Sequence, residues 1–321
     1  MLFEKRKNIK PYEYPNFVGF KDAIRQSYWV HDEFNFEDDV QDFKVECTDA
    51  EREAIKRTML AIAQIELDVK TFWGDLHQQI PKPEVAFVGS TYAESEVRHM
   101  DAYSHLLEIL GLNDVFEEIQ DIPAIQDRID YLEDFKTDFS SPEDVLEEVV
   151  LFSMFIEYVS LFSQFFIMLG FEKHTNRFTG ISNAVSATSK EEQIHGLFGI
   201  ELVNTALEEN PDLLPEDWEH TIVKACMKAY EAEIKILDWI FEEGELDFLP
   251  KSDVEAYLRL RFNKALTAIG IEELFEVSDE TRERLQWMED EVTVTTNGDF
   301  FDKRGTTYSK NMQPVTAGDL F

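Results

Sequence analysis

Two segments of the sequence place a glutamate and a histidine three residues apart within long apolar stretches. Glu96 precedes His99, and Glu192 precedes His195. On a helix, this spacing puts both side chains on one face, one turn apart, so that a carboxylate oxygen and an imidazole nitrogen can reach one metal ion. A bare carboxylate is costly to bury unless a cation or a hydrogen-bond donor compensates its charge. The pattern therefore indicates metal binding and predicts further ligands elsewhere in the chain.

The spacing alone is weak evidence in a chain with 66 acidic residues among 321. Asp217 and His220 show the same separation, but they follow Pro215 at the start of a predicted helix. We interpret that pair as a solvated first turn. The other two pairs differ because they lie inside long apolar helical patterns.

Two single glutamates occupy apolar helical positions of the same kind. Glu66 continues the stripe formed by Ile55, Met59, Ile62, Val69 and Trp73. Glu157 lies in the stretch 149–171, which is almost wholly apolar. Taken alone, Glu157 has two simpler interpretations, a hydrogen-bonded buried acid or a kink. A membrane span is a rival interpretation of its helix, but a central glutamate and acidic flanks disfavour it.

The elements that must position these residues are long helices. A capping box at Thr48 and Glu51 predicts a helix start, as do Ser141 and Pro142, and Gly111 predicts a helix stop. We divide the chain into an irregular N-terminal arm (1–45), a helical domain (46–292) and a flexible C-terminal tail (293–321). The predicted helices cover about 48–80, 84–110, 142–169, 176–209, 215–243 and 252–270. Gly170 lies just beyond the end of the third helix, and a capping box at Ser252 and Glu255 starts the last. An acidic linker joins the second and third helices.

Four consecutive helices thus carry Glu, Glu-x-x-His, Glu and Glu-x-x-His. This is the ligand set of ferritin-like dimetal proteins, in which two metals share four carboxylates and take one imidazole each. Four carboxylates leave two divalent ions neutral, as a buried core requires. Oxygen-rich ligation with one nitrogen per metal suits iron or manganese. The sequence therefore predicts an all-α, ferritin-like bundle with a buried dimetal-carboxylate site, held by Glu66, Glu96, His99, Glu157, Glu192 and His195.

Composition narrows the class of protein further. The formal net charge of −36 argues against a nucleic-acid surface, because phosphates would be repelled. Cys47 and Cys226 match no metal or redox spacing, and they suggest a reducing compartment. The first residues carry no apolar signal core. We therefore expect a cytoplasmic protein that spans no membrane.

Residues outside the ligand set give the chain a resemblance to a known family, the small, radical-generating subunit of class I ribonucleotide reductase. Tyr103 follows His99 by four residues, where that family places its radical tyrosine. Glu191 directly precedes Glu192, and Trp29 lies in the arm, like the family's relay tryptophan. The segment 298–304, followed by Tyr308, is similar to the family's ending.

The resemblance implies a ribonucleoside-diphosphate reductase subunit with two metal ions. An oxidising equivalent made at the metals would pass through Glu191, Trp29 and Tyr308 to a cysteine on the large subunit, where ribonucleotides are reduced. The tail would dock on that subunit, and we expect a homodimer. Each relay residue also has a simpler interpretation: Tyr103 as core packing, Trp29 as an anchor of the arm, and Tyr308 as an ordinary tail residue.

Glu66 departs from most of the family, in which the first ligand is aspartate. Among the subclasses with glutamate there, the chain resembles most the one that uses two manganese ions and no stored tyrosyl radical. Manganese is therefore the favoured metal, with iron as the alternative.

Two other functions fit the same ligand set. A stand-alone ferritin-like dimetal oxidase or desaturase would need an apolar substrate channel but neither Tyr308 nor a docking tail. A ferritin-type storage protein would be shorter and would not need Trp29.

Overall fold

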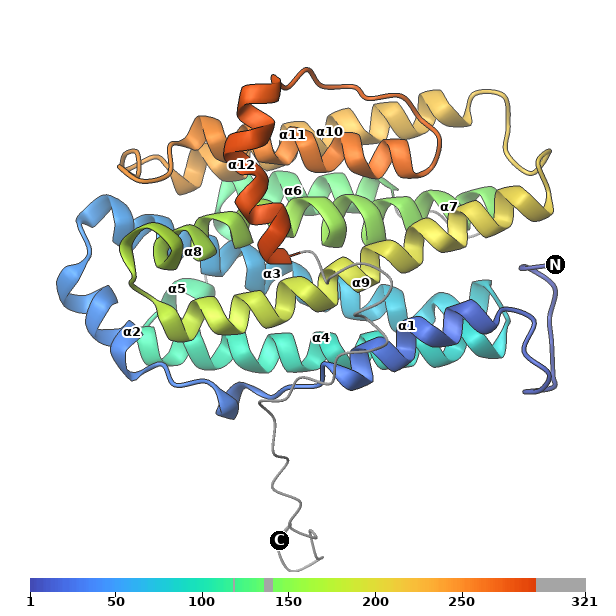
Figure 1. The fold of residues 1–321 in the computed structure, drawn as a ribbon, viewed down its shortest axis with the longest axis horizontal. Helices are drawn as coiled ribbons and strands as arrows, with labels where there is room; N and C mark the ends of the chain where they lie inside the picture. Colours follow the sequence, from blue (N-terminus) through green and yellow to red (C-terminus); the bar gives the residue numbers. More distant parts are fainter. Residues whose placement is uncertain (118, 136–140, 293–321) are drawn as a thin grey trace, which may run out of the picture.

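The protein, seen in a computed structural model, is described here for residues 1–117, 119–135 and 141–292. Within these ranges the chain forms helices and no extended strand (Figure 1). Long helices occupy the centre: α3 (Asp49–Gln79), α4 (Pro83–Leu110), α9 (Thr179–Glu209), and a continuous helix made of α7 (Pro142–Val149), η4 (Val150–Ser160) and α8 (Leu161–Thr175). The predicted all-α bundle is confirmed.

The helix ends follow the chemistry of the sequence at three sites. The Thr48 hydroxyl accepts a hydrogen bond from the Glu51 N–H at the start of α3, and Ser141 caps α7 in the same way through Asp144. Gly111 ends α4 in the left-handed region, with φ of 77°. These caps fix the lengths of the helices that carry the predicted ligands.

Two glycines let η4 and α9 approach closely. A Cβ at Gly196 would collide with the Tyr158 side chain, and one at Gly199 would collide with Ser153. The Ser153 hydroxyl donates a hydrogen bond to the His195 carbonyl oxygen at 2.9 Å. The two helices that carry Glu157 and His195 are therefore held in direct contact.

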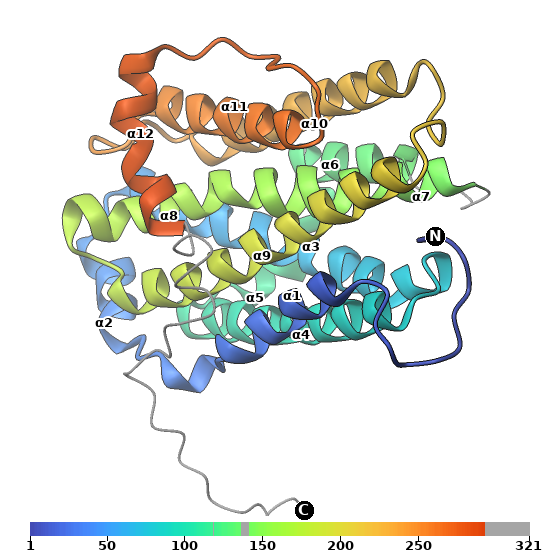
Figure 2. The same ribbon diagram turned by 45° about the vertical axis from the view of Figure 1, so that its right-hand side comes forward.

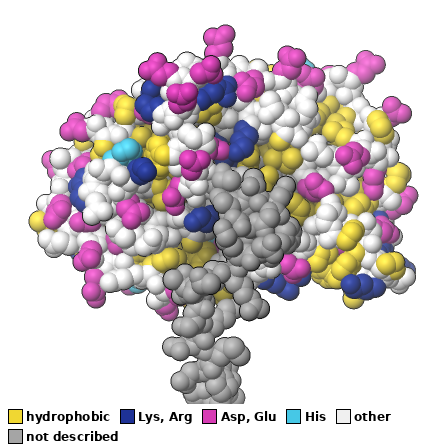
Figure 3. Space-filling model, in the orientation of Figure 1, with side chains coloured by type: hydrophobic (Ala, Val, Ile, Leu, Met, Phe, Trp, Pro, Cys, Tyr) yellow, Lys and Arg dark blue, Asp and Glu magenta, His cyan; other side chains and the backbone are white. Residues whose placement is uncertain are grey.

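Further helices cover the centre on both sides (Figure 2). α6 (Pro123–Phe135), α10 (Trp218–Ile240) and α11 (Lys251–Ala268) pack over α3 and the η4–α8 segment. α1 (Pro15–Gln26) covers α4 and α9, while α12 (Asp279–Val292) crosses α9 and α11 at a steep angle. Acidic side chains are spread over the face in Figure 3. Shorter elements are η1 (His31–Glu33), α2 (Glu37–Gln41), η2 (Asp42–Glu46), α5 (Asn113–Glu117) and η3 (Ile119–Asp121).

The N-terminal arm is not irregular as predicted. It contains α1, which buries Phe17, Ala23 and Ile24. Pro15 occupies the first turn of this helix, where its missing N–H costs nothing and its fixed φ favours helix. Pro15 therefore starts a helix within the segment that was predicted to be irregular.

The predicted acidic linker is also partly helical. In α6, Ile125 and Leu132 are buried, and so is Arg128, which pairs with Glu233 of α10. The high acid content of the segment hid this apolar face. α12, whose buried residues are Leu285, Met288 and Val292, was likewise not predicted.

The third predicted helix differs in its end and in its pitch. It passes through Gly170 to Thr175, because Gly170 serves close packing against Leu249 instead of a cap. Its middle, η4, is a π-helix of 11 residues, a wider form that is often found at functional sites. Glu157 lies in this wide segment.

Two smaller expectations have clear outcomes. α11 starts at Lys251, not at Ser252, because the Glu245 carboxylate accepts the Lys251 N–H at 2.7 Å. Asp217 and His220 are exposed at the start of α10, as expected for a solvated first turn.

The stretch Pro142–Thr175 is long and apolar enough to cross a membrane. Its most apolar 18-residue window is completely buried inside the protein, however. It is therefore the core helix that the sequence analysis favoured over a membrane span.

Candidate metal centre

The structure brings the six predicted ligands together in two overlapping groups, each with its donor atoms within 4.8 Å of one another. Glu96 and Glu192 belong to both groups, so they can bridge two ions. Each group adds one glutamate and one histidine of its own. The first contains Glu66, Glu96, His99 and Glu192, and the second contains Glu96, Glu157, Glu192 and His195.

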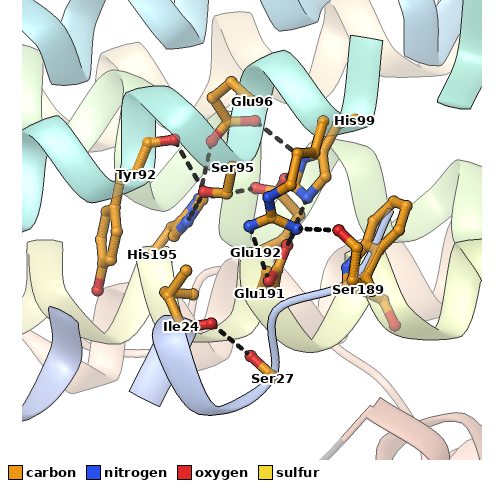
Figure 4. A network of polar contacts seen from close by, with 12 residues as sticks. Ile24, Ser27, Tyr92, Ser95, Glu96, His99, Ser189, Glu191, Glu192 and His195 are labelled. Atoms are coloured by element: carbon orange, nitrogen blue, oxygen red, sulfur yellow. Dashed lines mark hydrogen bonds and ion pairs between the residues drawn. The ribbon is translucent and has the colours of Figure 1, made fainter. Parts of the chain in front are cut away.

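Both imidazoles point the same ring nitrogen at the carboxylates. His99 Nδ1 lies 2.9 Å from Glu96 Oε2 and 2.9 Å from Glu192 Oε1. His195 Nδ1 lies 2.9 Å from Glu96 Oε1, so Glu96 sits between the two rings (Figure 4). Such inward nitrogens are placed to bind a metal once they are deprotonated.

The outer ring nitrogens have partners that fix this orientation. His99 Nε2 donates to Glu191 Oε2 at 2.9 Å. Ser95 donates its hydroxyl to the Tyr92 carbonyl, so it can accept from His195 Nε2 at 3.1 Å. A metal-binding histidine generally donates its other N–H in this way, which sets the tautomer.

The donor set fits a pair of divalent ions. All six side chains have an exposed fraction of 0%, and both oxygens of Glu66 and Oε2 of Glu157 lack a hydrogen-bond partner. Buried carboxylate oxygens without donors carry a large free-energy cost. Two divalent ions would balance the four carboxylates and supply the missing partners.

Two contacts of the ligands were not predicted. Trp73, which we had assigned only to an apolar stripe, donates its indole N–H to Glu157. Ser95 holds His195, as described above. Trp73 and Ser95 each lie four positions from another inward-facing residue of the same helix, Val69 and His99 respectively. Their residue types alone do not indicate a metal site.

The predicted relay residues Trp29 and Glu191 lie against His99. The Trp29 ring stacks on the imidazole, with ring centroids 5.7 Å apart and 15° between the planes. Arg98 donates to both Glu191 oxygens, at 3.1 and 3.2 Å, and to the Trp29 carbonyl at 3.2 Å. Arg98 was not predicted, and it fastens the N-terminal arm to the site.

Tyr103 is buried on the Glu66 side of the site. Burial, with a smaller contribution from the Glu66 charge, raises the pKa of its hydroxyl, which therefore stays protonated. Tyr103 also lines a cavity of about 690 Å³ between α3, α4 and α6, together with Gln64, Met100 and Ile129. Tyr308 lies outside the described residues.

The acid–base properties of the cluster follow from burial and crowding. Burial raises the pKa of Glu66 and Glu157 well above the ordinary carboxyl range. Burial disfavours protonation of His99 and His195, but the surrounding carboxylates, Glu96 above all, raise their pKa well above the usual value. Burial also opposes ionisation of Glu96, yet the two imidazoles lower its pKa. Without metal, the cluster therefore retains protons that entering ions must displace.

This predicts that the stabilisation by metal grows as pH rises. The four groups with a raised pKa, two glutamates and two histidines, bind protons more tightly in the folded state. Their contribution to the free energy of unfolding is complete below the unfolded values of 4.5 and 6.5 and is lost as pH rises through the folded values. Glu96 has the opposite sign, but its contribution is constant well above pH 4.5.

Unfolding temperatures with and without Mn²⁺, measured from about pH 6 to about pH 8.5, check the prediction. The metal-free protein should lose stability across this range, and the gap to the metal-loaded protein should widen. A gap that narrows with rising pH would contradict it.

Comparison with known proteins agrees with the site. A family described as "Ribonucleotide reductase, small chain" matches residues 6–283. A probable ribonucleoside-diphosphate reductase small subunit of Invertebrate iridescent virus 3 is 27% identical over 328 residues, covering 96% of this chain and 86% of the relative. The ribonucleoside-diphosphate reductase subunit beta of Chlamydia pneumoniae is 25% identical over 257 residues, covering 76% of this chain and 71% of the relative.

Solved structures share the fold. The ribonucleotide reductase R2 subunit from Clostridium botulinum has a TM-score of 0.79 at 17% identity, covering 88% of this chain and 90% of its own. An R2-like ligand-binding oxidase with a reconstituted Mn/Fe cofactor has a TM-score of 0.69 at 19% identity, covering 80% and 94%. The family match spans most of the sequence, and the helices place a carboxylate–histidine cluster at the centre of the bundle. The chain belongs to the ribonucleotide reductase small-chain family.

Proposed function

We propose that this chain is the radical-generating small subunit of a ribonucleoside-diphosphate reductase, an oxidoreductase that converts ribonucleotides to deoxyribonucleotides. One observation carries the proposal: a buried set of four carboxylates and two imidazoles with Trp29 stacked on one of those imidazoles. A metal-storage site needs the carboxylates and imidazoles, but it does not need a tryptophan stacked on one of the imidazoles.

Each ligand has a definite role in the proposal. Glu96 and Glu192 would be shared by two ions, Glu66 and His99 would help to hold the first, and Glu157 and His195 would help to hold the second. When bound, the metal pair supplies a strong one-electron oxidant. The apolar residues around the cluster exclude water, and Ser95 and Glu191 keep the imidazoles aligned.

We further propose that Glu191, Trp29 and Tyr308 form the route by which the oxidising equivalent leaves the site. His99 Nε2 contacts Glu191, and the Trp29 ring lies on His99, so that the first part of the route is continuous. Tyr308 would extend it to a cysteine on the large subunit, on which the C-terminal tail would dock.

We expect a homodimer in a reducing, cytoplasmic compartment. The free, buried state of Cys47 and Cys226 supports a reducing compartment.

Manganese is the metal that we favour, with iron as the alternative. Glu66 stands where most of the family has aspartate, and its longer side chain changes how the first ion is held. If the oxidising equivalent is stored on the metals, Tyr103 need not carry a radical.

Replacing Tyr103 with phenylalanine is therefore expected to leave substantial nucleotide reduction. The substitution keeps the ring in its buried position and removes only the hydroxyl. Activity with the purified large subunit is measured after loading with manganese or with iron, while metal analysis and electron paramagnetic resonance follow the site. Manganese should support more activity than iron. Complete loss of activity with normal metal content would instead indicate that Tyr103 carries the radical.

Tyr308→Phe, by contrast, is expected to abolish nucleotide reduction and to leave metal content and large-subunit binding unchanged. It preserves shape but removes the oxidisable, proton-releasing hydroxyl. Deleting the last several residues, including Leu320 and Phe321, should abolish binding, because these apolar side chains suit a partner groove. Full turnover by Tyr308→Phe would refute the relay, and undiminished binding by the truncated chain would refute the docking tail.

The cavity beside Tyr103 supports one second candidate, a stand-alone dimetal oxidase with an apolar substrate. Its described lining includes Met100, Leu107, Phe116 and Ile129. Such an enzyme would act without the large subunit, and Tyr308→Phe would leave its activity unchanged.

A further inference from the structure

Arg261, on α11, is completely buried behind the metal centre, and each nitrogen of its guanidinium group donates at least one hydrogen bond. Nε and Nη2 both donate to the Tyr158 carbonyl, at 2.8 and 2.5 Å. Nη2 also donates to Gln193 Oε1 at 3.0 Å, and Nη1 to Glu289 Oε1 at 3.2 Å. One side chain thus joins η4, α9, α11 and α12.

Two of these contacts fall directly beside proposed metal ligands. Tyr158 follows Glu157, and Gln193 follows Glu192. The guanidinium carbon also lies 4.1 Å from the centroid of the Tyr158 ring and 3.8 Å from that of Phe162. Arg261 therefore holds the backbone of η4 through a carbonyl, and it makes cation–π contacts with the Tyr158 ring of η4 and the Phe162 ring of α8.

The wide form of η4 makes such external support important. A π-helix is rare and occurs mostly as a single turn inside an α-helix, so 11 residues of it must be stabilised by their surroundings. The direction in which Glu157 points depends on that geometry. A change from the wide form to an α-helix would turn the residue away from its partners.

The charge of Arg261 is balanced on the outer side of the bundle. Glu289 of α12 pairs with Arg261 and with Lys264, whose Nζ lies 2.6 Å from Glu289 Oε2. Tyr257 donates its hydroxyl to the same carboxylate at 2.8 Å. The buried cation is therefore compensated without using a carboxylate of the metal centre.

We infer that Arg261 is a positioning residue that aims Glu157 and Glu192 at the second metal ion by fixing the residues next to them. The inference rests on the proposed function, because it takes both glutamates as ligands. It assigns α11 and α12, which contribute no ligand, a role in metal affinity.

The test compares two buried arginines. Arg261→Gln removes the contacts beside the ligands. Arg128→Gln is the matched control, because Arg128 is also buried, pairs with Glu233 and donates to a backbone carbonyl, that of Ala61, without touching a neighbour of a ligand. Unfolding temperature of the metal-free proteins and manganese content per chain at graded Mn²⁺ concentrations are measured for both.

Both substitutions should lower the unfolding temperature. Arg128→Gln leaves the buried Glu233 without its cation, and Arg261→Gln removes a buried cation that joins four helical segments. Only Arg261→Gln should also weaken binding of the second Mn²⁺, by about 10- to 100-fold, the usual effect of losing a residue that supports a ligand. Its paramagnetic resonance spectrum should shift from a coupled manganese pair toward a single ion. Arg261→Lys, which keeps the charge, should recover part of the affinity.

If Arg261→Gln does not fold, Gln193→Met provides a milder test, because it removes one acceptor and no charge. It should weaken binding of the second ion severalfold. Unchanged binding by the folded variants, or equal weakening in Arg128→Gln, would overturn the inference. Failure of the wild-type chain to bind two ions would instead overturn the proposed function, so the two failures are distinguishable.

Discussion

Replacing Glu192 with alanine is expected to remove both metal ions. Glu192 belongs to both ligand groups, and its two buried oxygens face the inward nitrogens of His99 and His195, at 2.9 and 3.4 Å. Without it, each ion loses a ligand, and three carboxylates no longer neutralise two divalent charges in a dry interior. We expect less than one ion per chain and a loss of nucleotide reduction of more than about 100-fold, beyond the effect usual for a residue that only supports a ligand.

Glu66→Ala is the matched comparison, because Glu66 belongs to one group only. It should retain about one ion per chain. Metal content is measured together with the unfolding temperature of the metal-free protein, which reports how far the substitution disturbs the fold itself. Two ions bound to Glu192→Ala would contradict the bridging role.

Gly196→Ala is the second substitution with a large expected effect. The added methyl group would overlap Cβ and ring atoms of Tyr158, which cannot move far because its ring packs on Arg261. Overpacking of this kind typically costs ~1–3 kcal/mol, and here it would also push η4 away from α9. We expect an unfolding temperature lower by several degrees and weaker binding of the second ion, because Glu157 moves with η4.

Gly74→Ala is the control, since its Cβ would meet only the Ala93 Cβ at 4.0 Å, an ordinary contact. Alanine is preferred to glycine inside a helix by about 0.5–1 kcal/mol, so this variant should be as stable as wild type or more so. Thermal unfolding and manganese titration of both variants test whether the close approach at Gly196 supports stability and metal binding. Equal behaviour of the two variants would show that the close approach at Gly196 is not required.

The ligand pattern was predictable because it uses local information. Glu96 and His99 share a helix face by spacing alone, and Glu66 stands out because it interrupts an apolar stripe. Caps at Thr48 and Ser141 and the stop at Gly111 are likewise local. The bundle follows, because four such helices can bury their glutamates only against one another.

The missed features depend on partners that are distant in sequence. Arg128 in an acidic segment suggests a surface residue until Glu233 is placed beside it. The width of η4 could not be predicted, because the segment is apolar on every side and shows no preferred face. Gly170 has the residue type of a helix stop, but the contact with Leu249 gives it another use.

The division of ligands between the helices has a consequence for the origin of the site. α3 and α4 form one helical hairpin that supplies Glu66, Glu96 and His99, while η4 and α9 form another that supplies the other three ligands. Each hairpin therefore brings two negative charges and one imidazole, enough to neutralise one divalent ion. Two copies of such a hairpin, associated about a twofold axis, would recreate the whole set. Such an association would account for two similar half-sites, of which one stands on regular α-helices and the other includes a widened segment.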